Sequence, residues 1–230
     1  FPWIEQAGSI QRAGLIAAAI VDLVNIQYEV DVNIKHVITT IVVRTTEASD
    51  PYNTNSPFEL LPAFRSEWNT NLMSVRRDVA HLLTGRELEG SVIGIAYIFG
   101  VCNVDGGGDR LSYGLSQRFG AMGCQTDLVA HELGHNWGAF HCECVPPVSE
   151  EEFTMNPFIT CANQFSDVTK GSIGAYRDFL QAFCLDCAGE PAGCDTGAFD
   201  CDTPHGTPYC NDAVCCGTVC TIEPFCCETS

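Results

Sequence analysis

The residues best suited to chemistry lie in one short stretch, HELGHNWGAFH, at residues 131–141. His131 and His135 are four residues apart, so on a helix their side chains project from the same face, one turn apart. Two imidazoles in this arrangement can bind one zinc ion at roughly 2.0–2.1 Å each. Gly138 tolerates the left-handed backbone that ends a helix sharply, which would let the chain turn back and present His141 as a third ligand. The spacing therefore predicts a zinc ion held by three histidines.

Glu132 follows the first predicted ligand directly, where its carboxylate can reach a metal-bound water rather than the metal. Three protein ligands leave the fourth position open for water, which is typical of catalytic rather than structural zinc. Zinc lowers the pKa of such a water to about 7 and polarises a carbonyl. We therefore predict one catalytic Zn²⁺ and a hydrolase in which Glu132 is the general base for attack of water on an amide. The predicted metal ligands are His131, His135 and His141.

Other features of the sequence add little to this site. The remaining histidines, His36, His81 and His205, are isolated, so packing is their expected role. A structural Ca²⁺ ion would be compatible with such a protein, although no motif predicts one.

The elements that must position these residues alternate between helices and strands. Apolar residues at three- and four-residue spacing predict a helix over 10–28, and further helices are expected over 56–72, 126–138 and 171–184. The β-branched residues 32–46 predict one or two strands, and residues 91–102 predict a buried strand. This alternation indicates an α/β layer architecture.

Composition indicates the compartment and excludes some partners. Fifteen cysteines favour a secreted, disulfide-bonded protein in its mature form. The protein or peptide substrates expected from the zinc motif would then be met outside the cell. The net charge of −18 argues against nucleic acid and anionic membranes as partners. The apolar run at residues 13–21 is shorter than the about 20 residues that span a bilayer, so no membrane insertion is expected.

The cysteines also divide the chain. Residues 187–230 are rich in Gly, Pro, Asp and Cys and show no periodicity, so we predict a catalytic domain over 1–186 and a disulfide-stapled tail over 187–230. The tail is compatible with a targeting or binding module and with a stabilising appendage. Its nine cysteines cannot all pair internally. The alternative to an active protease is a catalytically weak protease-fold binding protein whose tail directs protein–protein interaction.

The motif HELGHNWGAFH resembles the signature of the metzincin zinc endopeptidases, and Met155 in TMNP resembles the methionine of their characteristic turn. Within that group the chain is similar to the adamalysin or reprolysin branch. Residues 80–102 resemble the stretch leading into that branch's substrate-binding edge strand, and residues 164–185 resemble its closing helix. The resemblance implies a mixed twisted sheet with helices, an active-site helix, and a cleft above a smaller irregular lower part. It also implies an inhibitory prosegment that is removed in the mature form.

The resemblance has consequences for particular residues. It implies that residues 91–100 form the sheet edge above the cleft, that Met155 forms an apolar floor under the imidazoles, and that Cys102 pairs with Cys184.

Four further cysteines surround the motif. Because a thiolate in the fourth zinc position would displace the water, we expect Cys142 and Cys144 to form disulfides instead. Their expected partners are Cys124 and Cys161, in either of two arrangements.

Overall fold

The computed structural model describes residues 2–142, 152–181, 184 and 185. Helices dominate these residues. In chain order the elements are α1 (Pro2–Ala7), α2 (Ile10–Val32), the 3₁₀ helix η1 (Glu47–Ser49), α3 (Pro57–Thr70), β1 (Ala80–Thr84), β2 (Gly94–Ala96), β3 (Tyr113–Gln117), α4 (Met122–Asn136) and α5 (Asp167–Gln181). The helices expected over 10–28, 56–72 and 126–138 are confirmed, and the helix expected over 171–184 is confirmed as far as Gln181.

The sheet is small and mixed, with strand order β1-β3-β2. β1 pairs with β3 in parallel, with Ala80 opposite Tyr113, and β2 pairs with β3 antiparallel, with Gly94 opposite Ser116. β2 is therefore an edge strand of the sheet formed by the described residues. The sheet edge expected over residues 91–100 is confirmed for Gly94–Ala96.

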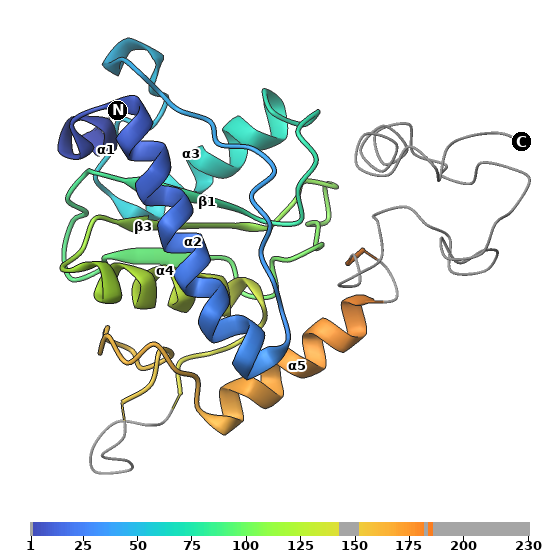
Figure 1. Cartoon of the computed structure of the whole chain (residues 1–230). Helices are drawn as coiled ribbons and strands as arrows, with labels where there is room; N and C mark the ends of the chain where they lie inside the picture. Colours follow the sequence, from blue (N-terminus) through green and yellow to red (C-terminus); the bar gives the residue numbers. More distant parts are fainter. Residues whose placement is uncertain (1, 143–151, 182–183, 186–230) are drawn as a thin grey trace, which may run out of the picture. The chain divides into compact units, whose positions relative to one another are not determined.

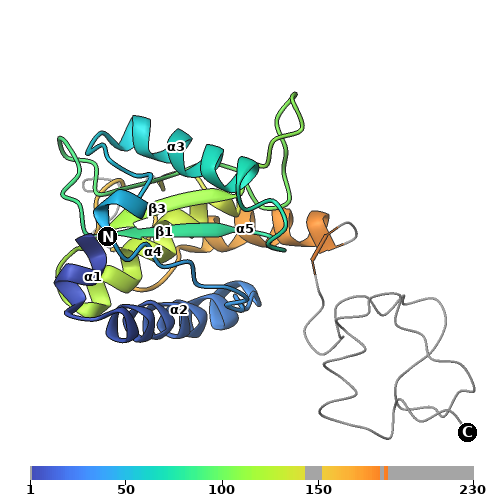
Figure 2. The same cartoon turned by 90° about the horizontal axis from the view of Figure 1, so that it is seen from above.

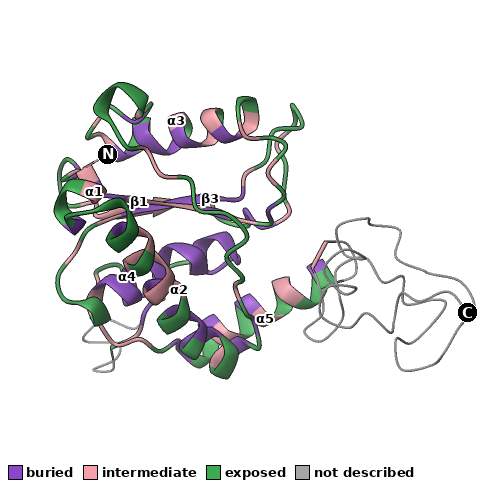
Figure 3. Ribbon diagram, turned by 45° about the horizontal axis from the view of Figure 1, so that its top comes forward, coloured by how far each residue is buried: buried purple, intermediate pink, exposed green. Residues whose placement is uncertain are grey.

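Helices cover both faces of the sheet, which gives the α/β architecture expected from the sequence. α3 lies on one face, and α4 lies on the other with α2 packed against it (Figures 1 and 2). The core between α3 and the sheet is aromatic, with Phe64 in edge-to-face contact with Tyr52, Trp68 and Tyr113. α4 is buried along almost its whole length (Figure 3). The helix that carries the histidines is thus a core helix.

The strand expected over residues 32–46 is wrong. After Val32 ends α2, residues 33–45 contain no strand. A cavity of about 270 Å³ is lined by residues 36–44 on one side and by residues 79–85, including β1, on another. β-Branched residues favour strands because they pack well in a sheet, but a strand also needs a backbone partner, and no backbone hydrogen bond joins residues 35–45 to another described segment. The strand expected over 91–102 is confirmed only for Gly94–Ala96, and these three residues are half-buried.

Helix α2 bears on the expectation about membranes. The run 13–21 is short, but the whole helix has 23 residues and is long and apolar enough to cross a membrane by length and composition alone. A core helix of a soluble protein passes the same test. In this structure α2 packs on α4 and buries Ile20, Val24 and Tyr28 completely.

The chain divides into two compact units, Phe1–Leu180 and Gln181–Ser230. The first unit contains every strand found among the described residues, and the motif helix. The cysteine-rich tail predicted for residues 187–230 lies outside the described residues, so its boundary and its role stay predictions.

Candidate metal centre

The end of α4 places the motif as its spacing predicts. Gly138 has a φ of 85°, in the left-handed region. Its N–H donates to the carbonyl of His135 and the N–H of Ala139 donates to that of Gly134, both at 2.9 Å. These are the two hydrogen bonds of a Schellman helix end, which satisfies carbonyls that a helix terminus otherwise leaves free. The chain then reverses and brings His141 back towards the helix.

Three imidazoles meet at this turn. One nitrogen from each of His131, His135 and His141 lies within 4.8 Å of the others. The Nε2 atoms of His131 and His141 are 3.2 Å apart. Two ligands of one tetrahedral zinc at about 2.0–2.1 Å stand roughly 3.3 Å apart, so this spacing fits a shared ion. His131 and His135 are buried, and His141 is exposed, which gives the group one open side.

The ring orientations suit metal binding. Nδ1 of His131 lies 2.7 Å from the carbonyl oxygen of Thr154, and Nδ1 of His135 lies 2.8 Å from that of Ala139. A carbonyl accepts only, so each Nδ1 carries the proton and each Nε2 keeps a free lone pair. Burial lowers the pKa of His131 to about 3 and that of His135 to about 4. Both rings are therefore neutral at pH 7, the form that binds a metal.

Glu132 lies beside this group on α4 and is also buried. Its Oε2 atom has no hydrogen-bond partner among the described residues. Its side chain fills the space that a Cβ atom at Gly94 would need, so the glycine of β2 allows the carboxylate to lie under the sheet edge. Burial raises the pKa of Glu132 well above its ordinary range. A buried carboxylate oxygen without a partner is expensive, which is consistent with a site that is completed by a water or an ion.

Met155 packs beneath the helix, as the resemblance implied. It is fully buried, and its Sδ atom occupies the space in which a Cβ at Gly134 would stand. Its carbonyl accepts a hydrogen bond of 2.8 Å from the N–H of Cys142. The methionine turn is thereby tied directly to the residue that follows His141.

Sequence reasoning missed three residues that support the site. Gly94 makes room for Glu132, Thr154 orients His131, and the fully buried Asn136 donates from Nδ2 to the carbonyls of Tyr97 and Tyr113. The only local signals were that Thr154 directly precedes Met155 and that Asn136 directly follows His135. The contacts themselves join residues that are distant in the sequence.

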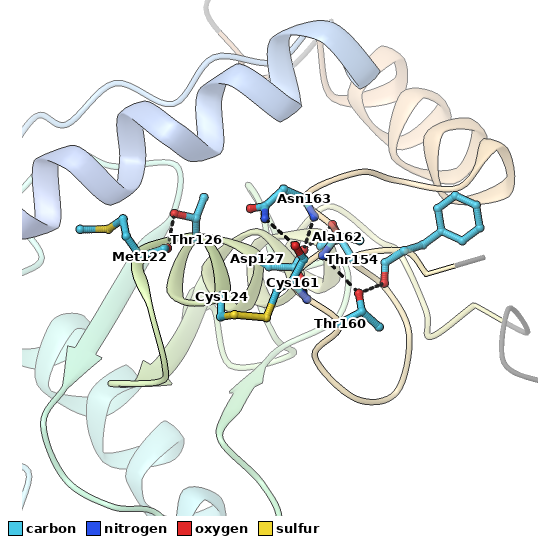
Figure 4. The surroundings of a disulfide bond; sticks show 10 residues. Met122, Cys124, Thr126, Asp127, Thr154, Thr160, Cys161, Ala162 and Asn163 are labelled. Atoms are coloured by element: carbon cyan, nitrogen blue, oxygen red, sulfur yellow. Dashed lines mark hydrogen bonds between the residues drawn. A yellow bond between two sulfur atoms is a disulfide. The ribbon is translucent and has the colours of Figure 1, made fainter. Parts of the chain in front are cut away.

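The expected partners of Cys142 and Cys144 are wrong, whereas the expectation that Cys142 forms a disulfide is confirmed. Cys124 pairs with Cys161 (Figure 4), with their Cα atoms 4.4 Å apart, so neither is available to another cysteine. Cys142 is itself disulfide-bonded, and Cys144 lies outside the described residues. Cys102 and Cys184 are also disulfide-bonded, while their pairing with each other stays a prediction.

Comparison with known proteins places this geometry in a family. The model of metallo-peptidase family M12B, reprolysin-like, matches residues 16–142, which is more than half of the chain. The chain belongs to this family.

Similar reprolysin-type proteins include snake venom metalloproteinase trimerelysin-2 of Protobothrops flavoviridis. It is 32% identical over 122 residues, which cover 50% of this chain and 55% of that protein. A zinc metalloproteinase/disintegrin of Bitis gabonica is 34% identical over 124 residues, or 50% of this chain and 34% of the relative. Disintegrin and metalloproteinase domain-containing protein 19 of Mus musculus is 35% identical over 88 residues, which cover 37% of this chain and 9% of that protein. The chain thus spans about half of these relatives' length or less.

Membership in the reprolysin-like family decides the metal. Zn²⁺ is the ion expected for an M12B metallopeptidase, and the three-histidine group can bind one metal ion. The resemblance to the adamalysin and reprolysin branch is confirmed.

Proposed function

We propose that this protein is a secreted zinc endopeptidase that hydrolyses peptide bonds, with His131, His135 and His141 as metal ligands and Glu132 as general base. The observation that carries the proposal is the convergence of three imidazoles, one of them exposed, next to a buried carboxylate whose Oε2 has no partner in the described part of the chain. A zinc ion bound there would polarise the scissile carbonyl and lower the pKa of a water molecule.

The roles of the protein side chains follow from their positions. Nδ1–H of His131 and of His135 holds each ring on a backbone carbonyl, so that both Nε2 atoms face the metal position. Glu132 accepts the proton of the attacking water and passes it to the leaving nitrogen.

The edge strand β2 would position the substrate. A peptide in extended conformation can add to a free sheet edge through backbone hydrogen bonds. β2 pairs with β3 on one side, and Gly94 in β2 contacts Glu132. A peptide along the other side of β2 would therefore run past the carboxylate, which suits cleavage within a chain.

Replacement of Glu132 tests the mechanism. Glu132→Gln keeps the size of the side chain but cannot accept the proton. Its kcat/KM on a fluorogenic peptide library should fall by about 10²–10⁴-fold, while its zinc content stays at the wild-type level. A variant that cleaves at the wild-type rate would contradict the role of Glu132. A zinc-loaded wild-type chain that binds unfolded protein without cutting it would instead support the alternative of a protease-fold binding protein.

We further propose that residues 1–186 hold the complete catalytic machinery and that the chain acts outside the cell. Disulfide bonds at Cys102, Cys124, Cys142, Cys161 and Cys184 support an oxidising compartment. A chain ending at Leu185 should bind one zinc ion and cleave an unstructured peptide with a kcat/KM close to that of the full chain. A folded, zinc-loaded truncation that is inactive would show that the tail contributes to the site.

A further inference from the structure

A buried carboxylate outside the motif is connected to the metal site by a short chain of contacts. Asp127 lies one helical turn before His131 on α4, and its side chain is fully buried. Its Oδ1 atom accepts a hydrogen bond of 2.7 Å from Oγ1 of Thr154. The carbonyl of Thr154 in turn lies 2.7 Å from Nδ1 of His131. One residue thus separates Asp127 from the ring that faces the metal.

The same carboxylate holds the segment that follows Met155. The N–H of Cys161 donates to Oδ2 at 2.9 Å, and the N–H of Asn163 donates to Oδ1 at 3.0 Å. Cys161 and Asn163 have φ values of 62° and 51°, which are uncommon for residues other than glycine. Such backbone persists only where the surroundings hold it. Asp127 supplies that support.

A disulfide reinforces the attachment at the same place. Cys124 lies three residues before Asp127 on α4 and is bonded to Cys161. Figure 4 shows the disulfide and Asp127 side by side between α4 and residues 160–163. The segment from Thr154 to Asn163 is therefore attached to α4 by one disulfide and by three hydrogen bonds to the carboxylate of Asp127.

We propose that Asp127 is a positioning residue of the metal centre, acting through Thr154 to fix the orientation and the tautomer of His131. The inference rests on the proposed function, because it takes His131 as a zinc ligand. Hydrogen bonds to the far nitrogen of a ligating histidine orient its ring and tune metal affinity. Asp127 acts one step further out, because it holds the hydroxyl of the residue whose carbonyl makes that bond.

Both oxygens of the Asp127 carboxylate accept from these three donors. Its two oxygens accept and do not donate, so each can face an N–H or O–H. In Asp127→Asn one oxygen becomes an NH₂ group, which must face either the hydroxyl of Thr154 or a backbone N–H of residues 161–163. A buried donor without an acceptor is costly, so the segment must shift away from α4.

Thr154 offers a milder test with a conservative partner. Thr154→Val keeps the shape but removes the hydroxyl that bonds to Asp127 and that accepts from Nε2 of Gln27 at 2.9 Å. Thr154→Ser keeps the hydroxyl. Asp31→Asn is a matched control, since Asp31 also receives a backbone N–H, that of Phe165 at 2.9 Å, but does not contact Thr154.

The experiment compares zinc binding and unfolding in the full-length chain and these four variants. Zinc affinity is measured by competition with a chromophoric chelator, the visible spectrum is recorded with Co²⁺ in place of zinc, and Tm is measured with and without zinc. Asp127→Asn and Thr154→Val should bind zinc about 10- to 100-fold more weakly, show an altered Co²⁺ spectrum, and gain less Tm from zinc. Thr154→Ser and Asp31→Asn should match the wild type in zinc affinity, in the Co²⁺ spectrum and in the Tm gained from zinc. Asp31→Asn also loses the 3.1 Å ion pair with Lys170, which should lower Tm equally with and without zinc.

Each result decides between a positioning role and a structural one. A loss of Tm that is equal with and without zinc, together with wild-type affinity and Co²⁺ spectrum, would overturn the positioning role. If Asp127→Asn does not fold, the Thr154→Val and Thr154→Ser pair decides, and equal affinities in that pair would overturn the inference. A wild-type chain that binds neither zinc nor Co²⁺ would overturn the proposed function, and this inference with it.

Discussion

The surroundings of α4 and the segment that follows α2, residues 33–45, are held in place in different ways. Around α4, each buried histidine has a carbonyl partner, and the methionine turn is held by Asp127 and by a disulfide. Residues 33–45, which follow α2, carry apolar side chains that face solvent. Val37 is 73% exposed and Ile41 is 46% exposed, and the cavity of about 270 Å³ lies beside them.

This difference shows what the structure holds rigidly. Buried polar groups must be paired, so a network of directional bonds permits few arrangements of the α4 region. Partly exposed apolar side chains form no directional bonds, so they do not restrict the backbone to one arrangement in this way. We therefore expect changes near α4 to have large effects on activity, and comparable changes in residues 33–45 to have small ones.

The largest expected effect comes from one methyl group. In Gly94→Ala the new Cβ would overlap the carboxylate of Glu132, which would have to leave its place under β2. Displacement of the general base should lower kcat/KM by about 10²–10⁴-fold while the zinc content is kept. Steady-state cleavage of a fluorogenic peptide measures this loss.

The control for Gly94→Ala is Gly171→Ala on α5. No atom lies within 4 Å of a Cβ added at Gly171, and the residue is exposed. Cleavage should be unchanged, and the free energy of unfolding should rise by about 0.5–1 kcal/mol. Equal activity of the two variants would show that Glu132 does not need the space at Gly94.

Removal of the disulfide tests how much the covalent bond contributes near α4. The bond joins residues separated by 37 positions in the sequence. Cys124→Ala combined with Cys161→Ala should lower the free energy of unfolding by about 2–4 kcal/mol in urea denaturation. Ile38→Thr, at a site that is 40% exposed, should change it by less than about 0.5 kcal/mol. Similar losses of unfolding free energy in the two variants would mean that the α4 region is not held more rigidly than residues 33–45.

The sequence could predict those parts of the site that depend on local spacing. His131 and His135 face the same way because of the helical repeat, and Gly138 ends the helix because it tolerates positive φ. The contact of Gly94 with Glu132 and the bond from Thr154 to Asp127 depend on the path of the chain through space.

The same limit explains the two errors. Four cysteines around the motif allowed several pairings, and only the approach of Cys161 to the start of α4 selects Cys124. Residues 32–46 have strand composition, yet a strand forms only where another backbone lies beside it, and here a cavity separates them from β1.

The smallest expected effect concerns His36, the point at which the two regions meet. Its Nε2 accepts a hydrogen bond of 3.0 Å from Nε1 of Trp137, the residue that caps α4. Burial lowers the pKa of His36 to about 4, compared with about 6.5 in the unfolded chain. Between these two values the unfolded chain binds more protons than the folded one. The stabilisation from neutral His36 is therefore complete above about pH 6.5, falls as the pH drops, and levels off below about pH 4.

The prediction is that His36→Gln flattens this pH dependence. Gln keeps an oxygen that can accept from Trp137 but does not titrate. Between pH 7 and pH 5 the zinc-free wild type should lose about 2 kcal/mol more of its unfolding free energy than the variant, since one pKa unit corresponds to about 1.4 kcal/mol. Urea denaturation of both zinc-free proteins measures the difference. The other histidines are present in both, although His36 also contributes, after burial, to the lowered pKa of His81. Equal slopes would mean that His36 is protonated in the folded chain as readily as in the unfolded one, so that the hydrogen bond from Trp137, which protonation of Nε2 must break, adds little to stability.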